Sequence, residues 1–450
     1  MAEIKKILIA NRGEIVQRAI RTIREMGKKS VAVYSAGDKN ASYLKHADEA
    51  VCIGGAKSSE SYLNIPAIIT AAEMTGCDAI FPGYGFLSEN QDFVEICRLH
   101  NIKFIGPSVE VMEKMADKSK AKEEMIRAGV PVVPGSKGSV HSVAEGKKVA
   151  LEIGYPIMAK AAAGGGGRGM RLIHDESEFD QLFMAASSEA LAAFGDGTMY
   201  LERFINNPRH IEVQVVGDSH GNAIHIGERD CSLQRRHQKV IEESPAILLN
   251  DETRAKLHDV AVKATKYLKY EGAGTFEFLA DDKQNIFFME MNTRLQVEHP
   301  VSEMVSGIDI VELMIKVAEG EKVPPQEAIK FRGHAIEVRI TAEDPNSFLP
   351  SPGKVTQWMV PGGRNVRVDS HVYAGYVVPP YYDSMIGKLI VWGRDRNKAI
   401  NIMKRALAEF EVEGIRTTIP FHKKMMENED FISNNYDTKY LENYKKLEDL

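Results

Sequence analysis

Cysteine is scarce in this sequence, and its spacing disfavours two classes of protein. The 450 residues contain four cysteines, Cys52, Cys77, Cys97 and Cys231, and none of them forms a C-x-x-C pair. The chain is therefore not a disulfide-built miniprotein, and a zinc site made of cysteines is not expected. Few, scattered cysteines are typical of a reducing compartment, so we expect a cytoplasmic protein.

Long apolar runs and excess positive charge are also missing. No run reaches the roughly 18 apolar residues that a membrane span requires. The apolar run near the N-terminus, residues 7–10, is too short for a secretory signal. Lys and Arg number 57 against 63 Asp and Glu, which gives a net charge of −6. The sequence therefore predicts no membrane span, and its overall charge gives no reason to expect nucleic-acid binding.

The first hundred residues alternate between strand patterns and helix patterns. Residues 7–10, 30–35 and 79–81 are predicted strands, and apolar spacing predicts a helix over 13–26. Strands separated by helices favour a parallel α/β sheet. Further on, we expect a helix over 117–128, strands at 156–160 and 335–340, and a helix over 396–409.

The length predicts about three domains at about 150 residues each. Residues 133–143 are rich in Gly, Ser, Pro and Val, which is typical of a hinge between structured segments. A further break between domains is expected at 331–333, after Pro324 and Pro325.

A glycine loop has the most unusual composition in the chain. Residues 163–169 read AGGGGRG and follow a predicted strand that ends at Lys160. Such a loop is either a flexible surface segment or a cradle whose N–H groups bind phosphate, with Lys160 adding charge. It is not a Walker A loop, because Met170 and Arg171 stand where Lys and Ser/Thr are required. It is not a dinucleotide fingerprint either, since no such motif follows the first strand.

A predicted hairpin over residues 275–292 places two carboxylates opposite each other. With the turn centred on residues 283–284, Glu277 lies opposite Glu290, Phe276 opposite Met291, and Phe278 opposite Met289. One face is then apolar, and the other presents Glu277, Glu290 and Asn292. Two acids about 5 Å apart repel by roughly 3 kcal/mol at an effective dielectric of 20.

This repulsion leaves three interpretations open. One acid takes up a proton, a divalent cation sits between them, or the face is solvated. Glu, Glu and Asn are the hard oxygen ligands that suit Mg²⁺ or Mn²⁺. If the chain stays extended, Arg294, Gln296 and Glu298 continue the same face. An arginine there can hold a small oxyanion, and a glutamate can remove its proton.

Residues 228–239, ERDCSLQRRHQK, form a dense charge cluster. They are either a solvated loop or a set of anion ligands beside a phosphate centre. Cys231 is expected to be a small buried residue rather than a nucleophile, since no base partner is identifiable.

From residue 7 to residue 440 the chain resembles the biotin carboxylase family, the ATP-grasp enzymes of biotin-dependent carboxylases. The matching motifs are ANRGEI (10–15), FPGYGFLSEN (81–90), GGGGRGMR (164–171), ERDCSLQRRHQKV (228–240), GTFEF (274–278), EMNTRLQVEHPV (290–301), AEDP (342–345), FLPSPG (348–353) and PPYYDSMIGKL (379–389). The resemblance implies a mixed α/β and α+β fold in three parts. These are a parallel α/β pre-ATP-grasp domain (1–114), an ATP-grasp domain (115–330) with a mobile lid (about 134–204), and a mixed β/α C-terminal domain (331–445).

The resemblance also implies roles for individual residues. The nucleotide is expected to contact Lys118, Lys160, Gly166, Gly167, Glu202, Arg203, Phe204, Ile205, His210, Gln234, His237, Glu277 and Glu290. The hinge at 202–205 departs from the family's commoner Glu-Lys-Tyr-Leu. The metal ligands are expected to be Glu277, Glu290 and Asn292. The expected bicarbonate site comprises Lys239, Arg294, Gln296, Val297 and Glu298. Catalysis is assigned to Arg294, Glu298 as the base, Lys239, and Arg339, which stabilises the biotin enolate.

The implied reaction uses ATP, Mg²⁺ or Mn²⁺ and bicarbonate to carboxylate biotin. The sequence lacks the Met-Lys-Met of a biotin attachment site and ends without a carboxyltransferase domain. We therefore expect biotin on a separate carboxyl carrier protein, and carboxyltransferase subunits as further partners. Acetyl-CoA carboxylase, which makes malonyl-CoA for fatty acid synthesis, is the expected complex, and a two-subunit pyruvate carboxylase is the alternative.

A homodimer is also implied. Arg21, Glu25 and Arg367 match interface positions, whereas Arg364 stands where the family has an aromatic residue. Two interpretations from other classes remain: another ATP-grasp carboxylate ligase, which leaves Gln296–His299 and Arg339 unexplained, and a catalytically dead scaffold, which conflicts with the filled ligand positions.

Overall fold

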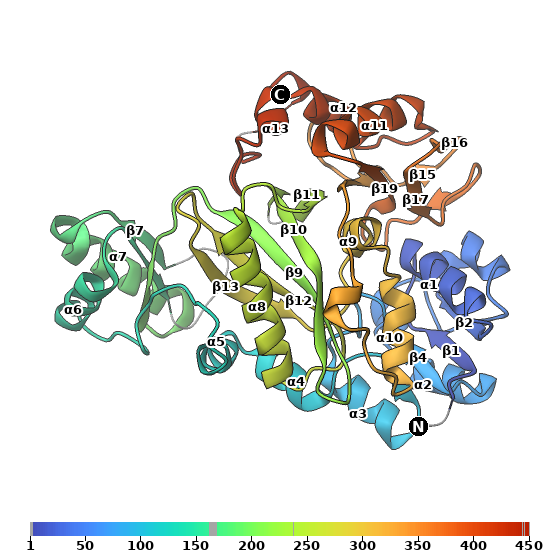
Figure 1. The fold of residues 1–450 in the computed structure, drawn as a ribbon, viewed down its shortest axis with the longest axis horizontal. Helices are drawn as coiled ribbons and strands as arrows, with labels where there is room; N and C mark the ends of the chain where they lie inside the picture. The colour runs from blue at the N-terminus through green and yellow to red at the C-terminus, as the bar shows by residue number, and fades with distance from the viewer. Residues whose placement is uncertain (1–2, 162–168, 237, 443, 445, 450) are drawn as a thin grey trace.

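The computed structural model describes residues 3–161, 169–236, 238–442, 444 and 446–449, and for Lys118, Ser119 and Phe194 the backbone alone. The described chain forms an N-terminal α/β part, a small projecting unit, and a large sheet that the central and C-terminal parts share (Figure 1). Most of the predicted glycine loop, including Gly166 and Gly167, lies outside the described residues, as does His237.

The N-terminal part is the predicted parallel sheet, in the order β3-β2-β1-β4-β5. The predicted strands at 7–10, 30–35 and 79–81 and the helix at 13–26 are confirmed within a residue or two. The central strand is buried on both faces, as a parallel sheet covered by helices requires. The elements are β1 (Lys6–Ile9), α1 (Glu14–Glu25), β2 (Lys29–Tyr34), β3 (Glu49–Cys52), α2 (Ile65–Thr75), β4 (Ala79–Phe81), α3 (Gln91–Leu99) and β5 (Lys103–Phe104).

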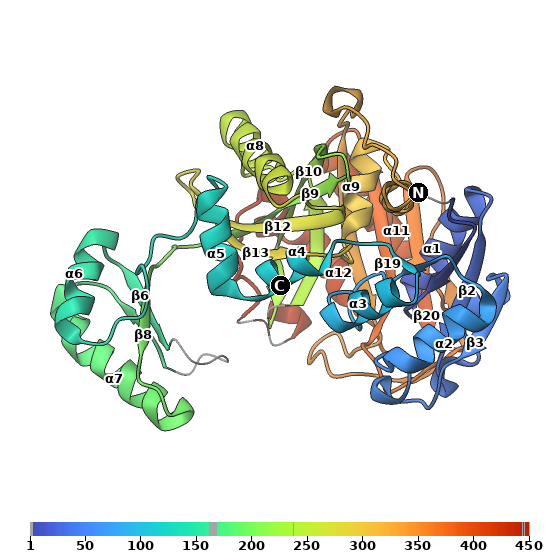
Figure 2. The ribbon, with the colours of Figure 1, turned by 90° about the horizontal axis from the view of Figure 1, so that it is seen from below.

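Two short helices lead to the projecting unit. Helix α4 (Val109–Ala116) ends at Asp117, whose side chain then caps α5 (Lys118–Arg127) by accepting from Lys120 N at 2.9 Å. The projecting unit is an antiparallel sheet, β7-β6-β8, with two helices packed on it. Figure 1 and Figure 2 both show it standing to one side of the rest. Its elements are α6 (Val143–Ile153), β6 (Ile157–Ala161), β7 (Met170–Ile173), α7 (Glu176–Phe194) and β8 (Met199–Arg203).

The large sheet runs in the order β13-β12-β9-β10-β11-β14-β19-β17, and each pairing in it is antiparallel. Strand β14 contains the predicted strand 335–340 and pairs with β11, so the sheet crosses the predicted boundary at 330/331. The elements of this part are β9 (Arg209–Gly217), β10 (Ala223–Arg235), β11 (Gln238–Ser244), α8 (Asp251–Tyr267), β12 (Gly272–Ala280), β13 (Ile286–Asn292), α9 (His299–Ser306), α10 (Ile310–Ala318), β14 (His334–Thr341), β17 (Val366–Ser370) and β19 (Met385–Gly393).

The C-terminal part packs helices against β14 and β19. Helix α11 (Arg396–Glu409) matches the prediction at both ends, and its Ala399 and Met403 belong to the same buried cluster as Leu389 and Val391. The remaining elements are β15 (Gly353–Lys354), β16 (Gln357–Met359), β18 (Val377–Val378), β20 (Glu411–Glu413), α12 (Ile419–Glu427) and α13 (Glu429–Ser433). Short 3-10 turns are η1 (Ala36–Asp38), η2 (Ser42–Lys45), η3 (Ser58–Glu60), η4 (Gln326–Ala328) and η5 (Leu447–Asp449). Within the described ranges, no helix combines the length and apolar composition needed to cross a bilayer.

Candidate active site

The predicted carboxylate hairpin is formed by β12 and β13. Glu277 pairs with Glu290 and Phe276 with Met291, as predicted. The predicted pair of Phe278 with Met289 is wrong, because the register shifts after Glu277 and Phe278 pairs with Phe288 instead. The extra residue is accommodated as a bulge near Met289, which is 40% exposed.

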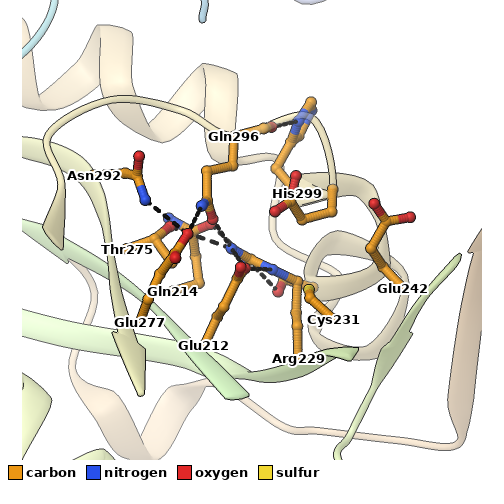
Figure 3. Close-up of polar contacts among 12 residues, drawn as sticks. Glu212, Gln214, Arg229, Cys231, Glu242, Thr275, Glu277, Asn292, Gln296 and His299 are labelled. Atoms are coloured by element: carbon orange, nitrogen blue, oxygen red, sulfur yellow. Dashed lines mark hydrogen bonds and ion pairs between the residues drawn. The ribbon is translucent and has the colours of Figure 1, made fainter. Parts of the chain in front are cut away.

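The chain does not stay extended beyond the hairpin, yet it still brings the predicted residues together. Strand β13 ends at Asn292, and Glu298 already caps helix α9 with φ −83° and ψ 9°. Asn292 Nδ2 and Gln296 Nε2 nevertheless both donate to Glu277 Oε1, at 2.7 and 2.8 Å. Figure 3 shows these two amides converging on the Glu277 carboxylate.

Two basic side chains, those of Lys239 and His210, also contact the Glu277 carboxylate. Lys239 Nζ donates to its Oε1 at 3.0 Å, and His210 Nε2 lies 3.0 Å from its Oε2. Burial would raise the pKa of Glu277, but the charges of Lys239 and His210 outweigh burial and hold that pKa well below its usual range. Burial likewise opposes protonation of His210, yet Glu277 and Glu212 raise its pKa to about 9.

The predicted base, Glu298, is buried between two cations. Lys239 Nζ donates to its Oε1 at 2.7 Å, and Arg339 Nη2 donates to its Oε2 at 3.0 Å. Burial alone would raise the pKa of Glu298, but Lys239 and Arg339 outweigh it and lower the pKa. The carboxylate is therefore ionised at neutral pH, which is the form that can accept a proton.

Arg294 lies at the edge of this cluster. Its Nη2 donates to Asn292 Oδ1 at 2.8 Å and its Nε to Glu89 Oε2 at 2.9 Å. Glu89 also accepts from the backbone N–H of Thr293 at 3.0 Å, so it fixes the turn that follows β13. Glu89 was not predicted, although it lies within the FPGYGFLSEN motif.

Sequence reasoning also missed the layer of buried polar residues beneath the site. The fully buried guanidinium of Arg229 donates to Glu212, to Gln214 Oε1 at 2.8 Å, and to Gln296 (Figure 3). The first half of the charge cluster at 228–239 is thus not a solvated loop, because β10 carries Glu228–Ser232 through the interior, whereas Arg236 and Gln238 are exposed. Cys231 is buried, as predicted. Polar residues at every second position of β9, His210, Glu212 and Gln214, were the signal that could have found this layer.

The predicted nucleotide residues lie on the projecting unit and at its junction with β9. Lys160 Nζ donates to Glu202 Oε2 at 2.6 Å, and Lys122, which was not predicted, lies 3.3 Å from Glu202 Oε1. Gln234 Nε2 lies 2.8 Å from His210 Nδ1. Arg203 ends β8, and Phe204 and Ile205 follow it. Lys118 begins α5, but its side chain is outside the described part.

Beside the base a cavity of about 740 Å³ opens between the N-terminal and C-terminal parts. It is lined by, among others, Arg12, Tyr84, Lys239, Val297, Arg339 and Tyr382. Its polar, cationic wall suits a small molecule that carries oxygen atoms.

The predicted metal ligands suit a hard cation in chemistry, although in this structure Asn292 Oδ1 accepts from Arg294 and Asn292 meets Glu277 through its Nδ2. Glu277 and Glu290 are direct cross-strand partners, and the Asn292 side chain reaches Glu277. All three supply oxygen atoms, as Mg²⁺ prefers. Ligand atoms of His210, Glu212 and Glu277 also lie within 4.8 Å of one another.

Comparisons with known proteins cover nearly the whole chain. Family models for the biotin carboxylase N-terminal domain, the carbamoyl-phosphate synthase L chain ATP-binding domain and the biotin carboxylase C-terminal domain match residues 3–112, 117–326 and 337–443. A biotin carboxylase of Nostoc sp. is 55% identical over 98% of this chain and 99% of its own length.

Two further relatives differ in their named roles. A pyruvate carboxylase subunit of Methanothermobacter thermautotrophicus is 51% identical over 98% of this chain and 90% of its own. A crystal structure of a biotin carboxylase–βγ-ATP complex from Campylobacter jejuni superposes with a TM-score of 0.89, is 67% identical, and covers 98% of this chain and 99% of that one.

Proposed function

The chain belongs to the biotin carboxylase family, and from that membership we propose that it is the biotin carboxylase subunit of an acetyl-CoA carboxylase. It is an ATP-dependent ligase of that family, and its proposed substrate is biotin carried on a separate protein. The observation that most supports biotin carboxylation is the Glu298 carboxylate, buried between Lys239 and Arg339 beside a cavity; it does not distinguish acetyl-CoA carboxylase from pyruvate carboxylase.

The first proposed step activates bicarbonate. Arg294, Lys239, the Gln296 amide and the Val297 N–H hold the anion, and Glu298 takes its proton. One oxygen then forms a bond to the γ-phosphorus of ATP while the bond to ADP breaks, which gives carboxyphosphate and ADP. Burial strengthens the attraction between Lys239 and the bound anion, because little water competes for it.

The second proposed step transfers CO₂ to biotin. Carboxyphosphate breaks down to CO₂ and phosphate, the phosphate removes the proton from N1 of biotin, and N1 attacks CO₂. Arg339 then stabilises the negative enolate oxygen of biotin. Because Arg339 already donates to Glu242 and Glu298, its guanidinium is held facing the cavity before biotin arrives.

The nucleotide is assigned to the junction of the projecting unit and the large sheet. The residues proposed to bind it are Lys160, Glu202, the backbone of residues 203–205, His210 and Gln234. The expected roles of Gly166, Gly167, His237 and the Lys118 side chain fall on parts outside the described structure. Mg²⁺ (or Mn²⁺), when held by Glu277, Glu290 and Asn292, would neutralise phosphoryl charge. The projecting unit is assigned as the lid of about 134–204 that excludes water from carboxyphosphate.

The proposed partners are a biotin carboxyl carrier protein, carboxyltransferase subunits and a second copy of the chain, in the cytoplasm. At the expected dimer positions, Arg367 already donates to Glu303 Oε2 at 2.7 Å and to Asp369, and Arg21 is half exposed. The alternative, a subunit of pyruvate carboxylase, is supported by the 51% identical archaeal relative.

The first experiment measures ADP formation by the purified protein with and without bicarbonate and free biotin. Hydrolysis that requires bicarbonate and rises with biotin supports the assignment, whereas hydrolysis that ignores both supports a different ATP-grasp ligase. Purification of the native complex then separates the acceptors. Co-purification of an acetyl-CoA carboxyltransferase supports the proposal, and a biotinylated pyruvate transferase supports the alternative.

A further inference from the structure

A row of charged side chains lies on one face of the large sheet, next to the proposed catalytic base Glu298. Glu242 of β11 is the direct cross-strand partner of Glu337 of β14, and Arg339 of β14 is the partner of Lys388 of β19. Partners across antiparallel strands share a face, and Glu337 and Arg339 are two residues apart, so all four point the same way. Glu242, Glu337 and Lys388 have no exposed surface.

Lys388 is the one member of this row that reaches the backbone next to the base. Its Nζ donates to the carbonyl oxygen of Val297 at 2.7 Å and lies 3.0 Å from Glu14 Oε1. Glu14 begins helix α1 of the N-terminal part, and its Oε1 also accepts from the Tyr84 hydroxyl. The Lys388 ammonium on β19 therefore contacts both helix α1 and the turn that precedes helix α9.

The charge balance around Lys388 favours a permanent ammonium. Burial alone would lower the pKa of Lys388, but the carboxyl groups of Glu14, Glu337 and Asp369 together outweigh burial and raise it. Burial also raises the pKa of Glu337 well above its usual range, against the opposing charge of Lys388. Asp369, the partner of Lys388 on β17, is bound by Arg367. Glu14 is the carboxylate that forms an ion pair with the Lys388 ammonium.

The Val297 carbonyl belongs to the peptide group that joins Val297 to Glu298. A peptide group is planar, so fixing its oxygen also fixes the direction in which Cα of Glu298 leaves it. The two backbone bonds of this turn, from His299 N to Gln296 O and from Val301 N to Glu298 O, are long, both 3.3 Å, and the shorter contact of 2.9 Å between His299 Nδ1 and Gln296 O does not involve the Val297–Glu298 peptide. Rotation of this peptide would move the base away from Lys239 and Arg339.

We propose that Lys388 is a positioning residue that, through the Val297 carbonyl, holds the Val297–Glu298 peptide in the orientation required for bicarbonate activation. Lys388 itself does not touch bicarbonate. This inference rests on the proposed function, because the Val297 N–H and the Glu298 carboxylate are both assigned to the bicarbonate site.

The test compares Lys388→Met with the double variant Lys388→Met/Glu14→Gln. The single variant leaves a buried carboxylate without its cation and is expected to lose thermal stability. The double variant removes both charges and is expected to regain most of that stability, but the Val297 carbonyl still lacks its donor. We expect its KM for bicarbonate to rise by about 10-fold or more, with the KM for ATP within about 2-fold of the parent.

Lys28 and Glu319 provide a matched control away from the site. Lys28 Nζ also donates to a backbone carbonyl, Ile4 O, and to a carboxylate, Glu319 Oε1, both at 2.7 Å. Lys28→Met/Glu319→Gln should lower the melting temperature without changing the KM for bicarbonate.

Three outcomes are distinguishable. A raised KM for bicarbonate in the Lys388 double variant, with the control unchanged, supports the inference. A double variant whose KM for bicarbonate equals that of the parent overturns it, while bicarbonate-dependent ADP formation by the parent leaves the proposed function standing. A parent without bicarbonate-dependent ADP formation overturns both.

Discussion

The two ends of the proposed site are built differently. At the bicarbonate end, Glu298 and Lys239 have side-chain exposures of 2% and 13%, and each contacts several charged partners. At the nucleotide end, Lys160 and Glu202 are 38% and 20% exposed and lie on the small projecting sheet. The difference indicates that the charged groups of the bicarbonate end are fixed by contacts within the protein, whereas those of the nucleotide end remain accessible to solvent.

The largest effect is expected from Glu298→Gln. The amide keeps the size of the side chain but cannot accept a proton, so bicarbonate-dependent ADP formation should fall by about 10²- to 10⁴-fold. Circular dichroism and the melting temperature show whether the variant is folded. Carboxylation at the parent rate by a folded variant would contradict the assignment of the base.

The next effect is expected from Arg339→Met. Losing this cation leaves Glu242 and Glu298 buried without their partner, which should cost about 3–5 kcal/mol of unfolding free energy and abolish biotin carboxylation. Urea denaturation measures the cost. The double variant Arg339→Met/Glu242→Gln should recover part of the stability but none of the carboxylation. If Arg339→Met lowers the unfolding free energy by less than about 1 kcal/mol, the bicarbonate end does not differ from the more exposed nucleotide end.

Two glutamates, Glu242 beside Arg339 and Glu202 beside Lys160, should contribute to the pH dependence of stability with opposite sign. Burial raises the pKa of Glu242 to about 7 from an ordinary value of 4.5, despite the opposing charge of Arg339. Between these two values the folded state holds a proton that the unfolded state has lost, so stability falls as pH rises, by roughly 3 kcal/mol. The unfolding free energies of the parent and of Glu242→Gln, measured against pH, should diverge over this pH range. Parallel curves would contradict the raised pKa of Glu242.

At the nucleotide end, burial would raise the pKa of Glu202, but Lys160 and Lys122 outweigh burial and lower it. The unfolded state therefore binds the proton first as pH falls. The stability that Glu202 contributes is present above its unfolded pKa and is lost as pH falls through the lower folded pKa.

The smallest effect is expected from Glu202→Gln. Both lysines remain partly solvated, so the substitution should change the unfolding free energy at neutral pH by less than about 1 kcal/mol and the KM for ATP by less than about 10-fold. Chemical denaturation and ATP titration measure these values. A cost equal to that of Arg339→Met would show that the two ends are not different in kind.

Local patterns predicted local structure well, and they failed where distant strands meet. Helix α11 and the pairing of Glu277 with Glu290 follow from periodicity and turn position. The bulge at Met289 has no comparable signal, because it depends on how β12 and β13 pack. Nothing in the local sequence indicates that Arg229 and Lys388 are buried, since a charged side chain is normally solvated. Their partners, Glu212, Gln296 and Glu14, are far away in the sequence, so spacing alone could not reveal their burial.

Isotope transfer tests the central claim most directly. The purified protein is given ATP, biotin and bicarbonate labelled with ¹⁸O, and the phosphate released is analysed by mass spectrometry. If bicarbonate attacks the γ-phosphorus, one labelled oxygen stays on phosphorus when the carbon–oxygen bond of carboxyphosphate breaks. Labelled phosphate is therefore the predicted result, and phosphate whose new oxygen comes from water alone would contradict the account.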